Sequence, residues 1–252
     1  MDSFKDYVIN LAAGLTGFVV ALAWDHIRKW RRLRSVRQFW RPFIGGSPMV
    51  VIGRFKEFSK FEASGLVGIG DAAALTELLG HLRSLGIDSP RWDFADRLHG
   101  DALRSDLILL GGPDANTITR ECVSRFPTSI RFGNPDRYQI SIQDTVSRRS
   151  YSPQYDERTG EVSLDYGLMF SSPNPFDASK RLLIIAGSFG YGTWAGCRLA
   201  IKPEKLGDQS ETLGADFECL FQTDIVYSTP QDIKLVTYRS LTSSNTSGAV
   251  IL

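Results

Sequence analysis

The sequence has few of the residues that build metal and redox sites. Only three cysteines and three histidines occur among its 252 residues, and neither type shows a CxxC or a Cys/His spacing. Widely separated cysteines in a chain of this size are typical of reduced, structural thiols rather than of a disulfide framework. The sequence therefore predicts no metal site and no bound cofactor.

An excess of charge of one sign is also missing. The chain carries 29 basic and 28 acidic residues, so its overall charge gives no reason to expect a nucleic-acid partner. The balance fails locally, because residues 28–41 contain seven basic residues and no acidic one. Since this stretch directly follows an apolar run, its basic side chains favour anionic lipid headgroups over RNA or DNA.

The apolar run extends from Tyr7 to Trp24 and contains no charged residue. As a helix it would be about 27 Å long, close to the roughly 30 Å hydrocarbon core of a bilayer. It is apolar on all sides, which predicts a transmembrane helix, and the basic residues after it predict that the rest of the chain lies in the cytoplasm. We therefore expect a single-pass membrane protein with a cytoplasmic domain.

Two other interpretations of this run stay open. It could be a cleaved signal peptide, although such peptides carry their positive charges before the apolar region. It could also be a buried helix of a soluble domain. Small residues at a spacing of four, Ala13, Gly17 and Ala21, allow two such helices to approach closely, which predicts a homo-oligomer formed through the transmembrane helix.

The remaining pattern divides the chain into segments. Two prolines and two glycines between residues 42 and 48 indicate a linker, and the polar residues near the end indicate a frayed terminus. We expect a transmembrane anchor over 1–27, a basic juxtamembrane segment and linker over 28–47, a cytoplasmic α/β domain over 48–242 and a flexible tail over 243–252.

Short apolar strands that lead into helices predict the fold of the domain. Residues 49–52, 107–110 and 182–186 are continuous apolar runs, each followed by glycine, and residues 71–85 have the leucine periodicity of a helix. Fully apolar strands of this kind are typical of a parallel sheet covered on both faces. We expect an α/β fold with a Rossmann-like, largely parallel sheet, an antiparallel β insertion over about 138–171 and a terminal hairpin over 217–241.

Glycine-rich turns after these strands resemble nucleotide-binding loops only in part. A G-x-G-x-x-A pattern begins at Gly190 and another at Gly68, but neither is followed by an evident strand that carries the acidic residue of a dinucleotide site. The turn after residue 186 also lacks the lysine of a P-loop. What the pattern does predict is an anion held by backbone amides at two helix starts, with these ligand-binding candidates: Gly111, Gly112, Asn116, Gly190, Gly192 and Thr193.

Three carboxylates are the candidates for catalysis. Asp71 and Glu77 belong to the predicted helix over 71–85, and Asp165 lies in the β-rich run before 171. Asp71 and Glu77 also have a structural interpretation, since an aspartate at a helix start often caps it and a glutamate within a helix is often solvated. The sequence contains no complete catalytic set, so it does not decide whether the protein is an enzyme.

Several motifs resemble those of a group of mostly uncharacterised bacterial and archaeal proteins. The group shares a GGP-x-x-N turn, a D-Y-G-L segment followed by NPF, and an A-G-x-x-G-Y-G-T turn. Here these motifs lie at 111–116, 165–176 and 186–193, within a resemblance that spans residues 65–225. The resemblance implies a single domain whose three motifs belong to one site or one packing arrangement, and it implies no activity.

These features lead to three hypotheses of function. The favoured one is a membrane-anchored, cytoplasmic, Rossmann-like domain that binds a small phosphorylated or nucleotide-like anion and acts as a sensor or regulator. The second is a nucleotide or NAD glycosidase or hydrolase that uses a carboxylate. The third is a non-catalytic, membrane-tethered scaffold.

Overall fold

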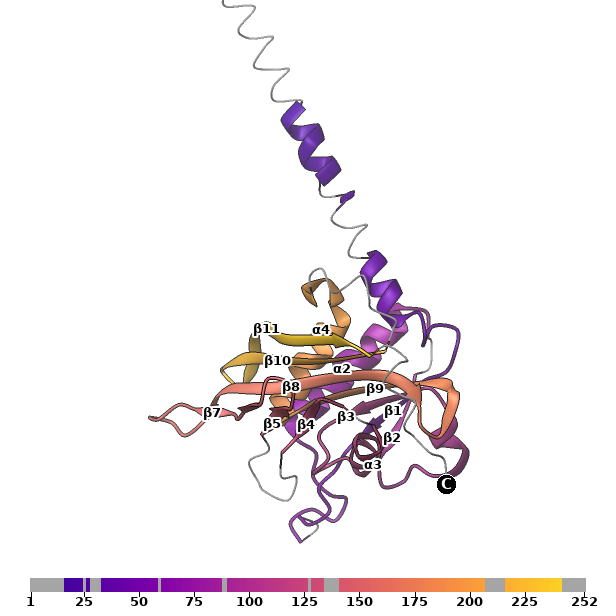
Figure 1. Cartoon of the computed structure of the whole chain (residues 1–252), viewed down its shortest axis with the longest axis vertical. Helices are drawn as coiled ribbons and strands as arrows, with labels where there is room; N and C mark the ends of the chain where they lie inside the picture. The colour runs from indigo at the N-terminus through magenta and orange to yellow at the C-terminus, as the bar shows by residue number, and fades with distance from the viewer. Residues whose placement is uncertain are drawn as a thin grey trace, which may run out of the picture.

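The computed structural model describes residues 16–24, 26–27, 33–58, 60–87, 90–126, 128–133, 141–206 and 216–241. Their centre is one twisted sheet with the strand order β11-β10-β8-β9-β3-β1-β2, to which β7 adds at β8 (Figure 1). A second, three-stranded sheet has the order β4-β5-β6.

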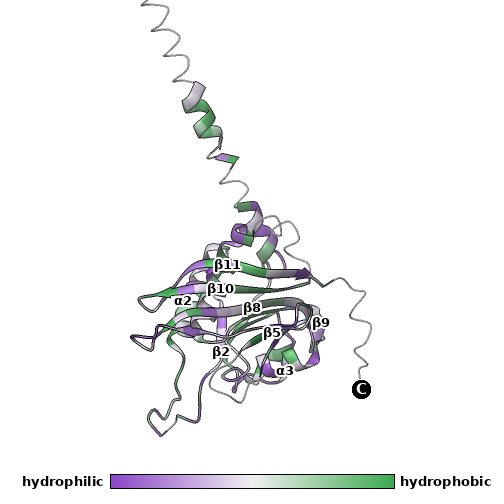
Figure 2. Ribbon diagram, turned by 60° about the vertical axis from the view of Figure 1, so that its left-hand side comes forward, coloured by the Kyte–Doolittle hydropathy of each residue, from purple (hydrophilic) through white to green (hydrophobic). Residues whose placement is uncertain are grey.

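One half of the main sheet is parallel. It consists of β2 (Arg91–Phe94), β1 (Met49–Ile52), β3 (Leu107–Leu110) and β9 (Asp177–Gly187), and β1 pairs in parallel with both β2 and β3 while β3 pairs in parallel with β9. All residues of β1 and β3 are buried, because helices and loops cover both faces. Figure 2, coloured by hydropathy, shows hydrophobic stretches along the labelled strands β8 and β10 of the same sheet.

The other half is antiparallel. It consists of β8 (Val162–Asn174), β10 (Phe217–Val226) and β11 (Thr229–Ser240), with the short β7 (Gln154–Tyr155) beside β8. Strand β8 turns back into β9 through a tight hairpin, and β10 pairs antiparallel with both β8 and β11. The hairpin of β10 and β11 therefore extends the main sheet.

The prediction of a Rossmann-like, largely parallel sheet is thus wrong. The parallel part is present only over four strands, and the pairings that add β7, β8, β10 and β11 are antiparallel, as are those of the second sheet. The physical reason is the β8–β9 hairpin: β9 enters the parallel half from an antiparallel neighbour rather than through a crossover helix. The β-rich run before residue 171, expected as part of an insertion, consequently belongs to β8, a central strand of the main sheet.

Helices cover the sheet on both sides. Helices α2 (Ile69–Ser84) and α4 (Gly190–Ile201) pack against one face, where Leu78 and Leu82 meet buried residues of β1, β3 and β9. Helix α3 (Thr117–Arg125) and the second sheet, formed by β4 (Ile130–Phe132), β5 (Ile142–Asp144) and β6 (Arg149–Tyr151), cover the other face. A short 3-10 helix, η1 (Gly100–Arg104), precedes β3.

Residues before β1 belong to this core. Residues 33–40 are helical, and Trp40 is fully buried, with its indole Nε1–H donating to the carbonyl of Ala200 at 3.0 Å. Its ring also packs against His81, so it contacts the last turns of both α2 and α4. The segment expected to be a juxtamembrane stretch and linker therefore packs at the ends of these helices.

No helix among the described residues is long and apolar enough to cross a membrane. The predictions of a transmembrane helix and of a single-pass membrane protein are therefore wrong. Of the predicted span, residues 16–24 are described, and they are helical. Residues 7–15, Ala13 included, lie outside the described residues, as does the predicted tail over 243–252.

Candidate functional site

The candidate residues gather where the parallel strands end, which we call the carboxyl edge. Strands β1 and β3 are followed by glycine, and β9 ends on Gly187. Helices α3 and α4 begin just beyond this edge, and the first turns of α2 and α4 touch, because a Cβ on Gly70 would lie 2.3 Å from the carbonyl of Gly190. Ligands of open α/β sheets bind at such an edge.

Asp165 occupies the start of α4. It lies on β8 beside the end of β9 and is fully buried. Its carboxylate accepts backbone N–H groups from Gly192 at 2.6 Å, from Tyr166 at 2.8 Å and from Phe189 at 3.3 Å. A carboxylate at a helix N-terminus is stabilised by the helix dipole. The helix start that the sequence assigned to a bound anion therefore already holds the side chain of Asp165.

Asp71 lies in the first turn of α2 and is 6 % exposed. Its Oδ1 is buried and meets no donor among the described residues. Glycines surround this carboxylate, since a Cβ on Gly68 would lie 2.9 Å from its Oδ2 and a Cβ on Gly111 would lie 3.8 Å from the carboxyl group. Oδ1 is therefore an unpaired hydrogen-bond acceptor, which we call the open acceptor, and glycine backbone surrounds the carboxyl group. Burying an unpaired acceptor costs free energy of folding unless a further group donates to it.

Burial raises the proton affinity of both carboxyl groups. Burial raises the pKa of Asp165 to about 7, against the opposing effect of its backbone hydrogen bonds, and the nearby Asp71 adds to the rise. Burial likewise raises the pKa of Asp71 to about 6, a hydrogen bond with Thr193 opposes it, and Asp114 adds to it. No cation is among the causes, so the edge is acidic and holds a proton near neutral pH.

Glu77 does not take part in this cluster. It lies further along α2, where its carboxylate accepts the indole N–H of Trp194 at 2.8 Å and forms an ion pair with Arg198 at 2.9 Å. Burial acts to raise the pKa of Glu77, but the hydrogen bonds from Arg198 and Trp194 outweigh it and lower the pKa. Glu77 therefore ties α2 to α4.

Asn116 also serves the fold. Its side-chain oxygen caps α3 by accepting the N–H groups of Ile118 and Thr119, both at 3.1 Å. Its Nδ2 donates to the carbonyls of Val51 at 3.2 Å and Leu110 at 2.9 Å. The side chain thus joins the ends of β1 and β3 to the start of α3, as expected of an N-cap asparagine.

The glycines of the turns allow close backbone contacts. Gly111 has a φ of +96°, which favours glycine. A Cβ on Gly187 would lie 2.2 Å from the carbonyl oxygen of Phe189, and a Cβ on Gly192 would lie 2.3 Å from that of Tyr166. Packing alone therefore requires glycine at 187 and 192, whereas a Cβ on Gly190 would lie 3.2 Å from the backbone nitrogen of Asp71 and would need a shift of only a few tenths of an ångström.

Gly112 and Thr193 lie where the turn after β3 contacts the turn after β9. A Cβ on Gly112 would lie 3.3 Å from the carbonyl oxygen of Gly187, so the turns after β3 and β9 are in contact. The hydroxyl of Thr193 accepts the N–H of Gly187 at 3.1 Å, and its proximity to Asp71 acts to lower the pKa of that carboxyl group. Asp71, Asp165, Gly111, Gly112 and Thr193 thus meet at one place.

Sequence reasoning missed two features of this edge. Ser188 follows β9 directly, is 3 % exposed, and its Oγ is buried without a partner among the described residues. Strand β2 was also missed, although it carries Asp93 beside Val51 of β1. The available signal for Ser188 was its position, since a polar residue at the end of a buried strand faces the ligand edge.

Only some of the motifs that resemble those of the uncharacterised group lie at the carboxyl edge. The GGP-x-x-N turn, Asp165 and the turn after β9 lie there, whereas the NPF segment lies at the β8–β9 hairpin, at the other end of both strands. There Asn174 donates to the carbonyls of Leu103 at 2.8 Å and Ser105 at 2.7 Å. The NPF segment therefore anchors the segment before β3.

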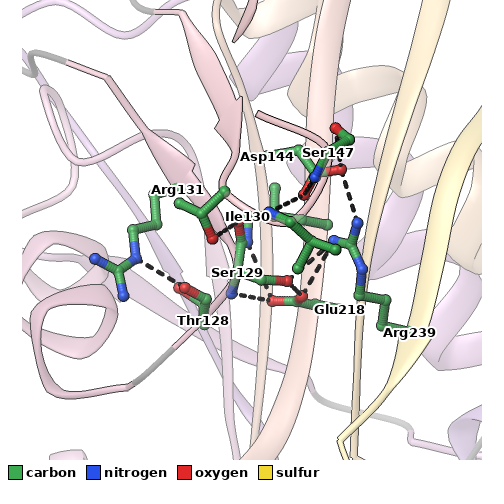
Figure 3. Close-up of polar contacts among 10 residues, drawn as sticks. Thr128, Ser129, Ile130, Arg131, Asp144, Ser147, Glu218 and Arg239 are labelled. Carbon is green, nitrogen blue, oxygen red and sulfur yellow. Dashed lines mark hydrogen bonds and ion pairs between the residues drawn. The ribbon is translucent and has the colours of Figure 1, made fainter. Parts of the chain in front are cut away.

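A second buried polar cluster, which sequence reasoning also missed, lies between the two sheets (Figure 3). Glu218 of β10 accepts the N–H of Ser129 at 3.0 Å and the hydroxyl of the same residue. Arg239 of β11 donates to Asp144 at 2.7 Å and lies 3.5 Å from Glu218. We call these four residues the inter-sheet cluster; the only sequence signal for it was a glutamate at an inward position of the alternating strand β10.

No group of His, Cys, Asp and Glu in the described part of the chain could hold a metal ion. No protein-family model and no curated protein matches this sequence. The candidate site therefore rests on its geometry, and the resemblance to the uncharacterised group stays a prediction.

Proposed function

We propose that the protein binds a small nucleotide-like molecule at the carboxyl edge and acts as a sensor or regulator. The observation that carries this proposal is the open acceptor of Asp71. A buried carboxylate oxygen without a donor is rare in proteins and calls for an explanation, and a ligand that supplies the donor is the explanation we propose. Its position beyond the ends of parallel strands is the usual place for ligands of such sheets.

Binding is favoured over catalysis because few groups at this edge are free to react. Both oxygens of Asp165 accept backbone N–H groups, and Glu77 is held by Arg198 and Trp194. Of the three predicted catalytic carboxylates, Asp71 alone then has a buried oxygen without a donor among the described residues. A single open carboxylate suits recognition better than hydrolysis.

A thermal-shift screen of the full chain against nucleotides, dinucleotides and cyclic nucleotides tests the proposal. A ligand at 100 times its Kd should stabilise the fold by about 2.7 kcal/mol. The proposal requires at least one compound to raise Tm, and it requires Asp71→Asn to weaken this effect. Absence of any stabilisation at millimolar concentration would count against a binding function.

The second candidate function is a nucleotide or NAD glycosidase or hydrolase. One observation favours it, since Asp71 and Asp165 have pKa values raised to about 6 and about 7, a range that suits general acid and base catalysis. Release of free base from NAD or a nucleoside, followed by chromatography and lost in Asp71→Asn, would support it. Binding without turnover would leave the sensor function.

A further inference from the structure

The first turn of α2 presents one open acceptor to the turn after β3. Asp71 is 6 % exposed, and its Oδ1 is buried without a donor among the described residues. The carboxyl group faces the glycine turn, since a Cβ on Gly111 would lie 3.8 Å from both of its oxygens. Oδ2 lies beside Gly68, 2.9 Å from where a Cβ of that residue would be. What this place lacks is one donor at Oδ1.

The charges around Asp71 disfavour a phosphate as the missing group. A second carboxylate borders the same turn, because a Cβ on Gly112 would lie 2.7 Å from Oδ1 of Asp114. Arg54, two residues after β1, forms an ion pair with Asp96 at 2.6 Å. A phosphate next to Asp71 would therefore meet repulsion from carboxylates, while this arginine is already paired.

The helix starts and a second arginine give an anion no further help. Asp165 accepts N–H groups at the start of α4, and Asn116 does so at the start of α3. Arg120 donates to the carbonyl of Pro113 at 2.6 Å. The first amides of a helix usually hold a phosphate at a strand-to-helix turn, and here side chains of the protein accept them. The missing group is therefore a hydrogen-bond donor without negative charge.

The single open oxygen selects among such donors. An ammonium ion carries several N–H donors and needs several acceptors, and a hydroxyl would bring lone pairs to an acidic edge. An amino group conjugated to a nucleobase is a donor only, as the NH₂ of an amide is. Carboxylates accept this kind of N–H from bases, and a hydrogen bond to an ionised acceptor is among the stronger ones.

We propose that Oδ1 of Asp71 accepts an N–H from the exocyclic amino group of a nucleobase, and that any phosphate of the ligand lies away from Asp71. This bond fills the open acceptor with one donor and brings no negative charge to the carboxylates. The subsite rests on the binding function proposed above and narrows it to ligands whose base carries an amino group.

Calorimetric titration of the full chain at pH 8 tests the subsite with matched probes. The probes are adenosine, cytidine and guanosine, each compared with the analogue that lacks only the exocyclic amino group: purine riboside, pyrimidin-2-one riboside and inosine. We expect at least one amino nucleoside to bind and its analogue to bind at least about tenfold more weakly, because the analogue leaves a buried acceptor unpaired.

The preference for the amino nucleoside should shrink at pH 5. Burial raises the pKa of Asp71 to about 6, so at pH 5 a proton occupies this carboxyl group and weakens it as an acceptor. Asp114 and Asp165 are the other carboxyl groups that interact with Asp71, and they act on both members of a pair of probes alike.

Asp71→Asn removes the charge from the acceptor. It should weaken binding of the amino nucleoside at least about fivefold, leave the analogue unchanged and abolish the pH dependence of the preference. Asp177→Asn is the matched control, since Asp177 begins β9 at the opposite edge of the sheet and is bonded to Ser179, and it should not change the affinity.

Gly68→Ala displaces the carboxyl group without changing its charge. Gly68 has a φ of −60°, which alanine adopts, but the added Cβ would lie 2.9 Å from Oδ2 of Asp71. The variant should lose the preference for the amino nucleoside, whereas Gly80→Ala on the same helix, with nothing within 4 Å of its Cβ, should keep it. Should Asp71→Asn fail to fold, Gly68→Ala and the paired probes on the unaltered chain decide the matter.

The outcomes separate this subsite from the binding function as a whole. Equal affinity for an amino nucleoside and its analogue would overturn the subsite and leave nucleotide binding intact. Competition by inorganic phosphate or by ammonium chloride would also overturn it, because it would place a simple ion at Asp71. Failure of all three amino nucleosides to bind would overturn the subsite, and a negative thermal-shift screen of nucleotides beside it would overturn the binding function as well.

Discussion

Two groups of buried carboxylates in this molecule have opposite environments. In the inter-sheet cluster, Arg239 pairs with Asp144 and Glu218, whose side chains are each 2 % exposed. At the carboxyl edge, Asp71 is almost as buried, but its Oδ1 meets no donor and its charged neighbours are carboxylates. A buried charge is tolerated when it is paired. Pairing with Arg239 therefore accounts for the burial of Asp144 and Glu218, whereas the burial of Asp71 needs another explanation.

The pKa values express the same contrast. Burial acts to raise the pKa of Asp144, but the hydrogen bonds from Arg239 and Ser147 outweigh it and bring it to about 2. Burial of Asp71, where no cation compensates, raises its pKa to about 6. The inter-sheet cluster thus holds the second sheet on the main sheet, whereas the carboxyl edge keeps an acceptor open.

The largest effect is expected from breaking the inter-sheet cluster. Arg239→Met leaves Asp144 and Glu218 buried without their cation, and removal of one partner from a buried ion pair costs about 3–5 kcal/mol. Denaturation in urea should show this loss. Lys234→Met is the control, because Lys234 and Asp224 form an exposed pair at 3.4 Å, and its loss should cost less than about 1 kcal/mol. Equal effects of the two variants would contradict the structural role of the cluster.

Two glycines of α2 test the close contact at the carboxyl edge. Gly70→Ala places a Cβ 2.3 Å from the carbonyl of Gly190 and should cost about 2–3 kcal/mol through overpacking. Gly80→Ala adds a Cβ that meets nothing within 4 Å and should stabilise the helix by up to about 1 kcal/mol. Urea denaturation measures both, and a neutral Gly70→Ala would show that α2 and α4 are not in contact there.

The stability of the fold should fall as pH rises from about 4 to about 7. The pKa values of Asp71 and Asp165 are raised in the folded state from an ordinary 3.8 to about 6 and about 7, so in this window the folded chain binds protons that the unfolded chain has lost. Stability then decreases with pH. The pKa of His81 is lowered by burial and acts in the opposite direction, so we expect a net fall of about 1–3 kcal/mol. Urea midpoints across this range measure it, and a flat or rising profile would contradict the raised values.

Asp71→Asn should remove part of this pH dependence. The amide cannot ionise, so the variant should be more stable than the unaltered chain at pH 8 by about 1 kcal/mol, and the difference should vanish near pH 4. Asp144→Asn should do the opposite and destabilise at pH 8, because it removes a carboxylate whose pKa is lowered by Arg239. If both variants changed the stability at pH 8 in the same direction, the distinction between the carboxyl edge and the inter-sheet cluster would be contradicted.

Local elements could be predicted from the sequence, and their assembly could not. The strands over 49–52 and 107–110 have the predicted bounds, and helix α2 lies within two residues of its prediction, because apolar runs and leucine periodicity are local signals. Strand β8 was taken for part of an insertion because its role depends on pairing with β10, about 50 residues later in the chain. Pairing between strands so far apart in the sequence produces no local sequence pattern.

The site was predictable in position but not in chemistry. Glycines after apolar strands indicated the carboxyl edge, and Asp71 and Asp165 were named as candidates. Their roles depend on what surrounds them: Asp165 is bonded to three backbone N–H groups, while Asp71 is left open. Glu77 is also a carboxylate on α2, as Asp71 is, but Arg198 of α4 forms an ion pair with it.

Carbon-13 NMR of the aspartate carboxyl groups, titrated with pH in the full chain, tests the distinction most directly. The account predicts that Asp71 titrates near 6 and Asp165 near 7, while Asp144 stays ionised down to about 2. It also predicts that the Asp71 signal is the one most shifted by a bound nucleotide-like ligand. An ordinary pKa for Asp71, near 3.8, would show that this carboxylate is solvated or paired and would contradict the open acceptor on which the proposed site depends.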